Sequence, residues 1–255
     1  MNLLEKVCII TGGGSGIGRA TAIALAQKGS KVCIVGRTSS KLTDVLAEVK
    51  LNKGEGITIE ADITEYQSIE NVVERVKNAW GRIDILVNNA GANIKNRGVL
   101  ETTPEEIQSL VNVNLVGTMF FTKAVLPTMI SQNSGTIINV SSNSAIWPSL
   151  MGGVAYCAAK AGVNNFTEFL NDELQHMLIR ACTISPGEVV TPILEKRRFM
   201  PDKEALETMC LPEYIAETIL LASSLPPRTM ITEMVVTPTV TRDKSAELIK
   251  RPGQK

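Results

Sequence analysis

"VCIITGGGSGIGRA", residues 7–20, decides the fold expected for this chain. An apolar run of strand length leads into a glycine-rich turn, and a segment with helical character follows it. Gly12 permits a tight turn, Gly16 lets the backbone approach a ligand, and Gly18 lets a helix pack close to the strand. The backbone amides at the start of that helix would then face a phosphate group.

The spacing of these glycines, G-x-x-x-G-x-G, differs from the two commonest nucleotide fingerprints. The pattern G-x-G-x-x-G fails at every register. A P-loop fails as well, because Gly18 is followed by Arg19 and Ala20 instead of Lys and Ser or Thr. The turn therefore predicts a phosphate-binding site without the anchor that NTP hydrolysis needs.

Six further apolar runs have strand length. The seven candidate strands cover residues 7–11, 31–36, 56–61, 84–89, 135–142, 180–185 and 233–237. Segments with helical spacing of apolar residues, such as 16–29 and 65–79, lie between them, which predicts βαβ units and a parallel sheet covered by helices. No linker or repeat interrupts the chain, so we expect one α/β domain over residues 1–255. The polar tail, 244–255, is expected to be poorly ordered or to reach a partner subunit.

Composition excludes several functional classes. The chain has 26 basic and 26 acidic side chains, which argues against a nucleic-acid partner. No secretory signal or long uncharged apolar run is evident, so a soluble cytoplasmic protein without a membrane partner is expected. The five cysteines form no C-x-x-C pair, as is typical of free thiols in a reducing compartment. With His176 as the sole histidine, neither a metal site nor a Ser-His-Asp triad is expected.

The stretch "VAYCAAKAG", residues 154–162, places Tyr156 and Lys160 four residues apart, where a helix over 155–177 lays one side chain over the other. Read alone, the pair also fits an ordinary surface helix. A tyrosine with an unperturbed pKa of about 10 is a poor base at neutral pH. We expect the Lys160 ammonium to lower the pKa of Tyr156 and so make the phenol an acid/base for carbonyl or alcohol chemistry. His176 would lie about 30 Å along the same helix.

Five stretches, "TGGGSGIG", "NNAG" at 88–91, "NVSS" at 139–142, "YCAAK" at 156–160 and "PGEVVT" at 186–191, occur in the order of the motifs of one family. Over residues 5 to about 240 the sequence resembles the classical short-chain dehydrogenase/reductases. The resemblance implies a single-domain, doubly wound Rossmann sheet of seven parallel strands, a nicotinamide cofactor and a homotetramer or homodimer formed through helices 103–130 and 155–177.

The resemblance also implies a set of site residues. The catalytic group would be Asn114, Ser142, Tyr156 and Lys160. Ser142 precedes Tyr156 by 14 positions, one more than the family pattern, so Ser144 is the alternative; Asn112 is the alternative to Asn114. Lys160 would also hold the nicotinamide ribose. The remaining cofactor contacts would be Gly12, Ser15, Gly16, Ile17, Gly18, Asp62, Ile63, Asn89, Ala90, Gly91, Pro186, Gly187, Val189 and Thr191.

The end of the second candidate strand predicts the choice of cofactor. Gly36 stands where NAD-binding Rossmann sites usually have a carboxylate, and Arg37 follows it, with Thr38 and Ser39 as further donors. An arginine fork suits a 2′-phosphate, so NADP(H) is preferred over NAD(H). The alternative is that Arg37 is a solvated loop cation stacked on adenine.

The segments 93–98, 144–153 and 192–211 are expected to form the substrate wall, with 192–211 as the substrate loop. Their apolar side chains are Ile146, Trp147, Leu150, Met151, Ile193, Phe199, Met200 and Met209. Arg197 and Arg198 are interpreted as a solvated helix face, and the alternative is that they bind a carboxylate of the substrate. The favoured substrate is a small hydroxy acid or ketone. A 3-oxoacyl thioester reductase is the alternative within the class, and a catalytically silent NADP sensor or scaffold is the alternative outside it.

Overall fold

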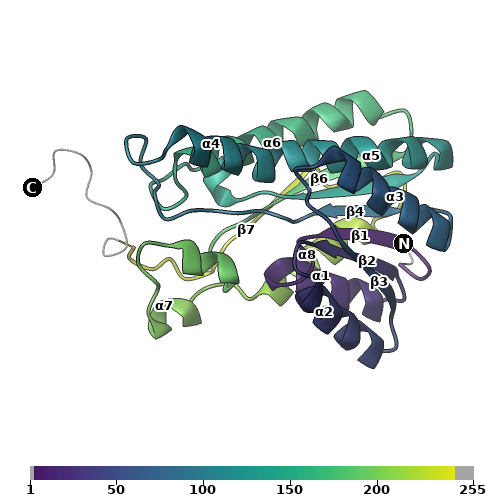
Figure 1. The fold of residues 1–255 in the computed structure, drawn as a ribbon, viewed down its shortest axis with the longest axis horizontal. Helices are drawn as coiled ribbons and strands as arrows, with labels where there is room; N and C mark the ends of the chain where they lie inside the picture. Colours follow the sequence, from purple (N-terminus) through teal and green to yellow (C-terminus); the bar gives the residue numbers. More distant parts are fainter. Residues whose placement is uncertain (1–2, 245–255) are drawn as a thin grey trace, which may run out of the picture.

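The computed structural model describes residues 3–244 and contains one seven-stranded parallel sheet in the order β3-β2-β1-β4-β5-β6-β7 (Figure 1). The predicted α/β fold with a doubly wound parallel sheet is confirmed. The strands are β1 (Val7–Thr11), β2 (Lys31–Gly36), β3 (Glu55–Glu60), β4 (Ile85–Asn88), β5 (Gly135–Val140), β6 (Ile179–Pro186) and β7 (Glu233–Val236). The tail predicted to be poorly ordered lies outside the described residues beyond Lys244.

All seven predicted strands are present: β1 and β2 have the predicted ends, and the ends of the other five differ by one or two residues. β5 ends at Val140, two residues before the predicted end, and the two serines that follow line the cavity described below. β6 extends to Pro186, one residue further than predicted, and pairs with β7 over that residue. The alternation of buried strands with helices therefore predicts the strand positions well and their last residues less well.

Helices cover both faces of the sheet, as Figure 1 shows. The principal helices are α1 (Gly16–Gln27), α2 (Ser39–Leu51), α3 (Tyr66–Trp80), α4 (Pro104–Val111), α5 (Gly117–Gln132), α6 (Val154–Leu174) and α8 (Pro212–Ser224). α1, α2 and α8 lie on one face, and α3, α5 and α6 lie on the other. Each of these six helices contributes buried apolar residues to one of two cores, one on each side of the strands.

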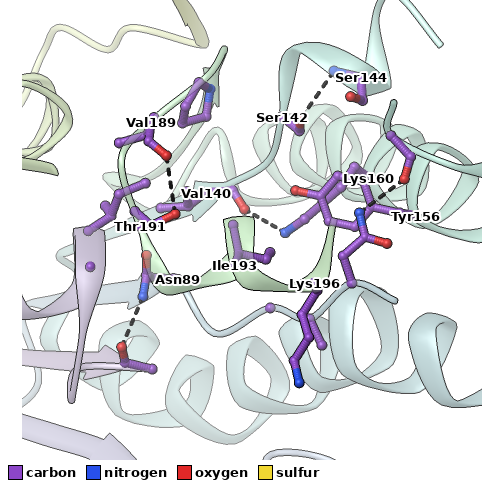
Figure 2. Close-up of a pocket in the computed structure, with 18 of the residues that line it drawn as sticks. Asn89, Val140, Ser142, Ser144, Tyr156, Lys160, Val189, Thr191, Ile193 and Lys196 are labelled. Carbon is purple, nitrogen blue, oxygen red and sulfur yellow. Dashed lines mark hydrogen bonds between the residues drawn. The ribbon is translucent and has the colours of Figure 1, made fainter. Parts of the chain in front are cut away.

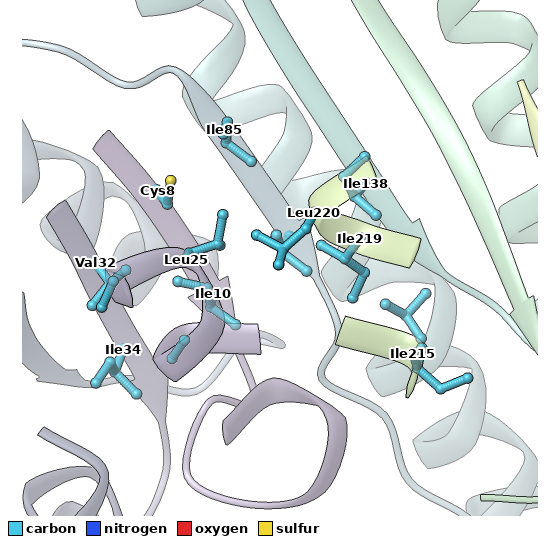
Figure 3. Close-up of a cluster of buried hydrophobic side chains, with 14 of the residues drawn as sticks. Cys8, Ile10, Leu25, Val32, Ile34, Ile85, Ile138, Ile215, Ile219 and Leu220 are labelled. Carbon is cyan, nitrogen blue, oxygen red and sulfur yellow. The ribbon is translucent and has the colours of Figure 1, made fainter. Parts of the chain in front are cut away.

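The core between the sheet and helices α1, α2 and α8 illustrates this packing (Figure 3). Leu25 of α1 and Ile219 of α8 pack against Ile10 of β1, and all three side chains are fully buried. The neighbouring strand residues Val32 and Ile85 continue the same layer on either side. The continuous apolar character of the strands follows from this burial on both faces.

The order of the strands creates a crevice. The chain runs outward from β1 to β2 and β3, then returns to place β4 on the other side of β1. At such a reversal, the loops that follow adjacent strands diverge at the carboxyl edge of the sheet, and a ligand-binding crevice opens between them. The glycine turn after β1 and the loop after β4 lie on the two sides of this opening.

The helix predicted over 103–130 is divided into three parts. A capping box between Thr103 and Glu106 starts α4, a π-helical turn (Asn112–Val116) interrupts the run, and α5 continues it. By length and composition, the whole run Pro104–Gln132 is apolar enough to cross a membrane. The structure places Phe121 and Val125 of this run in the core, as in a helix that packs on a sheet.

The predicted substrate loop is partly helical. It contains a short 3-10 helix (Pro192–Lys196), called η3, and the five-residue helix α7 (Lys203–Glu207). Another 3-10 turn, η2 (Asn143–Ala145), follows β5. The long helix α6 ends at Leu174, three residues before the predicted end, and His176 lies exposed in the turn that follows.

Candidate functional site

The crevice at the carboxyl edge of the sheet forms a cavity of about 750 Å³. Every predicted cofactor residue lines it except Gly18, and so do three of the four predicted catalytic residues. Figure 2 shows the central part, with Asn89 after β4, Val140 at the end of β5, and Tyr156 and Lys160 on α6. Segments from across the chain thus meet where the strand order predicts a ligand.

The glycine turn is built for close approach of backbones. Gly12 has φ +63°, and a Cβ there would lie 2.8 Å from the Cα of Ala90. A Cβ on Gly18 would press into the carbonyl of Gly12 and the amide of Asn89. Gly18 therefore has the predicted packing role and does not line the cavity. The turn leaves the amino end of α1 directed at the crevice, where a pyrophosphate fits.

The loop after β4 is fixed to the end of β1. The backbone amides of Asn89 and Ala90 both donate to the hydroxyl of Thr11, each over 3.0 Å. The Asn89 side chain donates to the carbonyls of Thr11 (3.0 Å) and Gly12 (3.3 Å). These hydrogen bonds hold the predicted ribose-flanking residues in place against the glycine turn.

The adenine end of the cavity is defined here as the part formed by the glycine turn, Gly36, Arg37, Asp62 and Asn89. Arg37 is exposed, as a side chain reaching for a phosphate in solvent would be. The Asp62 carboxylate accepts the amide and the hydroxyl of Thr64, each at 2.8 Å. These hydrogen bonds, led by the backbone one, lower the pKa of Asp62, with a smaller contribution from the charge of Arg37. Asp62 is therefore an oriented acceptor.

Tyr156 and Lys160 both reach the cavity from α6, one turn apart (Figure 2). Lys160 is 3% exposed, and its ammonium donates to the carbonyl of Val140 over 2.8 Å. The Lys160 nitrogen lies 5.8 Å from the centre of the Tyr156 ring. The pair predicted from spacing is therefore brought together, and the end of β5 orients the lysine.

The predicted electrostatic effect of Lys160 on Tyr156 is not what the structure shows. Burial raises the pKa of the Tyr156 phenol, and the opposing influences come from the Ser142 hydroxyl and the charge of Arg97. Burial also lowers the pKa of Lys160, to about 8. The reason is that both groups lose solvent together, so desolvation outweighs the stabilisation of the phenolate that the sequence predicted.

Ser142 both caps a short helix and lines the cavity. Its side chain accepts the amide of Ser144 at 3.1 Å and so caps the short helix after β5. The same hydroxyl lies beside Tyr156 and lines the cavity. Ser144, the alternative, lines the cavity too. Of the two serines, Ser142 is the one whose hydroxyl lies next to the phenol, and its part in catalysis stays a prediction.

Asn114 lies in the π-helical turn, is fully buried and does not line the cavity within residues 3–244. Its side chain accepts the amide of Ala92 at 3.1 Å and donates to the carbonyl of Ala92 at 2.9 Å. Asn114 thus fixes the loop after β4 from behind, and its predicted place in a proton path stays a prediction. Asn112, the alternative, accepts a hydrogen bond from Gln108 on the outer side of α4.

The predicted nicotinamide segment follows β6. Gly187 donates to the carbonyl of Val236 over 2.7 Å, which ties the turn to β7. The Thr191 hydroxyl donates to the carbonyl of Val189 over 3.3 Å (Figure 2). Both residues line the cavity together with Pro186 and Gly187, so the four predicted residues form one continuous wall.

The predicted substrate wall is partly wrong. Trp147, Met151 and Ile193 line the cavity. Five others do not line it within the described chain: Ile146, Leu150, Phe199, Met200 and Met209. Phe199 and Met200 are exposed because the chain turns outward after η3, and Met209 is buried.

Sequence reasoning missed a group of charged residues at the other end of the cavity. This substrate end is lined by parts of the segments 91–97, 142–156 and 188–197 and by Lys244. Arg197 was interpreted as solvated, but it is 11% exposed and donates to the Glu188 carboxylate at 2.9 Å. Arg198 is exposed and pairs loosely with Glu101 at 3.5 Å, as its interpretation requires. Arg97, buried on the same wall, was not singled out at all.

Known proteins with similar sequences span nearly the whole chain. An uncharacterized oxidoreductase of Staphylococcus saprophyticus is 35% identical over 93% of this chain and 99% of its own. A 3-oxoacyl-[acyl-carrier-protein] reductase of Thermotoga maritima is 36% identical over 88% and 92%. The solved closed form of a serine dehydrogenase complexed with NADP+ is 27% identical, covers 96% of this chain and 100% of its own, and superposes with a TM-score of 0.85.

The model of one family matches residues 6–202, from the lysine before β1 to the start of α7. That range includes the glycine turn, the loop after β4, Ser142 and the Tyr156–Lys160 pair. The order of the motifs, the strand order and the family match agree, and the chain belongs to the short-chain dehydrogenase family.

Proposed function

We propose that the protein is an NADP-dependent oxidoreductase that interconverts a secondary alcohol and a carbonyl, with Tyr156 as the general acid/base. The observation that carries the proposal is the meeting of Tyr156 and a buried Lys160 with the glycine turn in one cavity. A nicotinamide dinucleotide, when bound, supplies or accepts the hydride. The protein must then provide a proton donor on the substrate oxygen and hold that oxygen in place.

The structure supports this division of work. The raised pKa keeps the Tyr156 phenol protonated at neutral pH, so a proton is available for a developing alkoxide. The Ser142 hydroxyl lies beside the phenol and can donate to the same oxygen. Lys160, with a pKa of about 8, carries its charge at neutral pH and stabilises the phenolate that remains after proton transfer.

The dinucleotide fits the residues that line the cavity. The close backbone approach at Gly12 leaves room for a pyrophosphate at the amino end of α1. Arg37 and the absence of an acidic side chain at Gly36 favour a 2′-phosphate, hence NADP(H) over NAD(H). The related serine dehydrogenase, solved with NADP+, supports the same preference.

A small hydroxy acid or ketone is the favoured substrate. The 36% identity to the Thermotoga maritima reductase favours a 3-oxoacyl thioester as the second candidate. A panel of oxo acids, ketones, secondary alcohols and acyl thioesters, assayed in both directions with NADP(H) and NAD(H), separates the two. Tight NADPH binding with no turnover across the panel would contradict catalysis and favour the silent NADP-sensing alternative.

We also propose assembly through α4, α5 and α6 in a reducing cytoplasm. Apolar side chains are exposed on these helices at Ile107, Met119, Ile130 and Phe169, and all five cysteines are free and buried. Covering such side chains would lower the exposed apolar area. Light scattering of the purified protein tests the expected dimer or tetramer, and a monomer at micromolar concentration would contradict it.

A further inference from the structure

Arg97 stands out among the residues at the substrate end because it is a buried cation. The side chain is 7% exposed, and the residue lines the cavity. Its guanidinium donates to three backbone carbonyls, those of Ile94 (2.9 Å), Met151 and Lys196 (3.2 Å). The three acceptors belong to three different loops. Arg97 therefore fixes the walls of the substrate end to one another.

These carbonyls do not balance its charge. No ion pair joins Arg97 to a carboxylate in residues 3–244, and the charged side chain that acts on it most is another cation, Arg197. Burial lowers the pKa of Arg97, which reflects the cost of holding this charge away from water. A buried charge is ordinarily paired, so the site lacks an anion. Guanidinium N–H groups remain beyond the three that bind carbonyls.

The surroundings carry the same sign. The charged residues that line the substrate end are Arg97, Lys160, Lys196, Arg197, Lys244 and one acid, Glu188. The Glu188 carboxylate is already shared by Arg197 at 2.9 Å, Lys244 at 3.0 Å and Arg242 at 2.7 Å. The whole chain has a formal net charge of zero, whereas basic side chains outnumber acidic ones at the substrate end, so this end carries a local excess of positive charge. Such concentration attracts an anionic ligand.

Arg97 is also close to the chemistry. Its carbonyl accepts the amide of Val154 at 3.0 Å, two residues before Tyr156 on the first turn of α6. The charge of Arg97 acts on the Tyr156 phenol, so the two side chains face the same space. An anion held by Arg97 would therefore lie in the same end of the cavity as a carbonyl held at Tyr156.

We propose that Arg97 binds a carboxylate of the substrate, so that the protein acts on short oxo acids and the corresponding hydroxy acids. The inference rests on the proposed function and narrows it from carbonyl compounds in general to acids whose carboxylate and reacting carbon are near neighbours. Arg97 has two N–H groups left, one on each terminal nitrogen, that can donate to a carboxylate, and its contacts with the three loops fix the guanidinium before the substrate enters.

The first experiment compares each acid with its neutral ester. NADPH-dependent reduction of 2-oxo, 3-oxo and 4-oxo acids and of their methyl esters is measured for the unmodified protein, Arg97→Lys and Arg97→Met. The unmodified protein should prefer one acid over its ester by about 100-fold in kcat/KM, the scale of one charge-assisted contact. Arg97→Met should lose that preference, so that acid and ester are reduced with similar kcat/KM, and Arg97→Lys should keep part of it.

Arg198→Met is the matched control. Arg198 is the next arginine along the same segment as Arg197, is exposed, and does not line the cavity, so its removal should leave the preference for the acid unchanged. Equal loss of acid and ester turnover in Arg97→Met, with the preference intact in Arg97→Lys and NADPH binding unchanged, would show that Arg97 is only a clamp between loops. That result would overturn the proposal.

A second measurement needs no turnover. Tyr156→Phe with bound NADPH should be stabilised against heat by the preferred oxo acid and not by its methyl ester, and adding Arg97→Lys should weaken that stabilisation. If the unmodified protein reduces nothing but this selective stabilisation is present, the proposed function fails and the carboxylate site stands. If reduction proceeds with the ester equal to or better than the acid, the function stands and the role of Arg97 is refuted.

Discussion

The two ends of the cavity are built by different means. At the adenine end, the backbone does most of the work: glycines allow close approach, and Asn89 ties the turn to its neighbouring loop through hydrogen bonds to carbonyls. At the substrate end, long charged side chains from separate segments meet: Arg97 binds backbone carbonyls of three loops, and Glu188 pairs with Arg197 and Lys244. The first end depends on local sequence, and the second depends on the completed fold.

This difference separates what binds any dinucleotide from what selects a substrate. Backbone amides and glycine turns recognise a phosphate whatever is attached to it. Side-chain charges recognise a specific group at a specific place. Variants at the reacting centre should therefore affect turnover. Variants at the substrate end should affect stability, and variants at the adenine end should affect the choice of cofactor.

The largest effect is expected between the two ends, at the phenol. Tyr156→Phe removes the hydroxyl that the proposed function makes the proton donor and leaves the ring in place, so carbonyl reduction should fall by about 10³-fold. NADPH binding, measured by fluorescence titration, should change little because the glycine turn and Arg37 are untouched. Cys157→Ala, at the next residue, is the control and should keep its activity, since Cys157 does not line the cavity. Retained turnover in Tyr156→Phe would refute the acid/base assignment.

The substrate end is next, through Glu188. Burial acts to raise the pKa of this carboxyl, but hydrogen bonds from Arg242, Lys244 and Arg197 outweigh it and hold the pKa at about 2. The stabilisation that this implies, about 3 kcal/mol, is present above the ordinary pKa of 4.5 and is lost as pH falls toward 2. Glu188→Gln should therefore lower the free energy of unfolding by about 3 kcal/mol at neutral pH, as measured by urea denaturation.

The same variant should flatten the acid dependence. Between pH 4.5 and 2 the unmodified protein should lose this contribution, whereas Glu188→Gln has none to lose. Glu101→Gln removes a carboxylate from an exposed pair with Arg198 and should cost less than about 1 kcal/mol. Equal destabilisation in the two variants would show that the Glu188 cluster contributes no more than an exposed ion pair.

A smaller effect is expected in the pH dependence of turnover. Because burial lowers the pKa of Lys160 to about 8, its ammonium is lost as pH rises through that value, while the raised pKa of Tyr156 keeps the phenol protonated. Reduction should therefore weaken above pH 8, by up to about tenfold per pH unit. Lys160→Arg cannot lose its charge in this range, so its pH profile should be flat there. A decline that persists in Lys160→Arg would assign it to another group.

The adenine end was the more predictable of the two. The spacing of Gly12, Gly16 and Gly18 is readable within seven residues of sequence, and the strand before it identifies its place in the sheet. The four-residue interval between Tyr156 and Lys160 is local in the same way, since a helix brings the two together whatever surrounds it. The doubly wound arrangement of seven parallel strands was implied by the family resemblance.

The substrate end was not predictable, because its burial and charge pairing arise from distant segments. Arg197 stands between two other basic residues and has the pattern of a solvated face, yet it is buried by Glu188, nine positions away, and that acid also binds Arg242, 54 positions away. The π-helical turn at Asn114 and the raised pKa of Tyr156 likewise depend on what packs around them. A sequence pattern gives spacing along the chain, and desolvation depends on neighbours in space.

The smallest expected effect is at the adenine end, where a variant tests whether a side chain determines the choice between NADPH and NADH. Arg37→Asp replaces the exposed fork with a carboxylate that repels a 2′-phosphate and accepts ribose hydroxyls, so the ratio of kcat/KM with NADPH to that with NADH should fall by about tenfold or more. Lys50→Asp makes the same charge change at an exposed position near the end of α2, outside the cavity, and should leave the ratio unchanged. An unchanged ratio in Arg37→Asp would mean that cofactor choice, like phosphate binding, is made by the backbone of the turn.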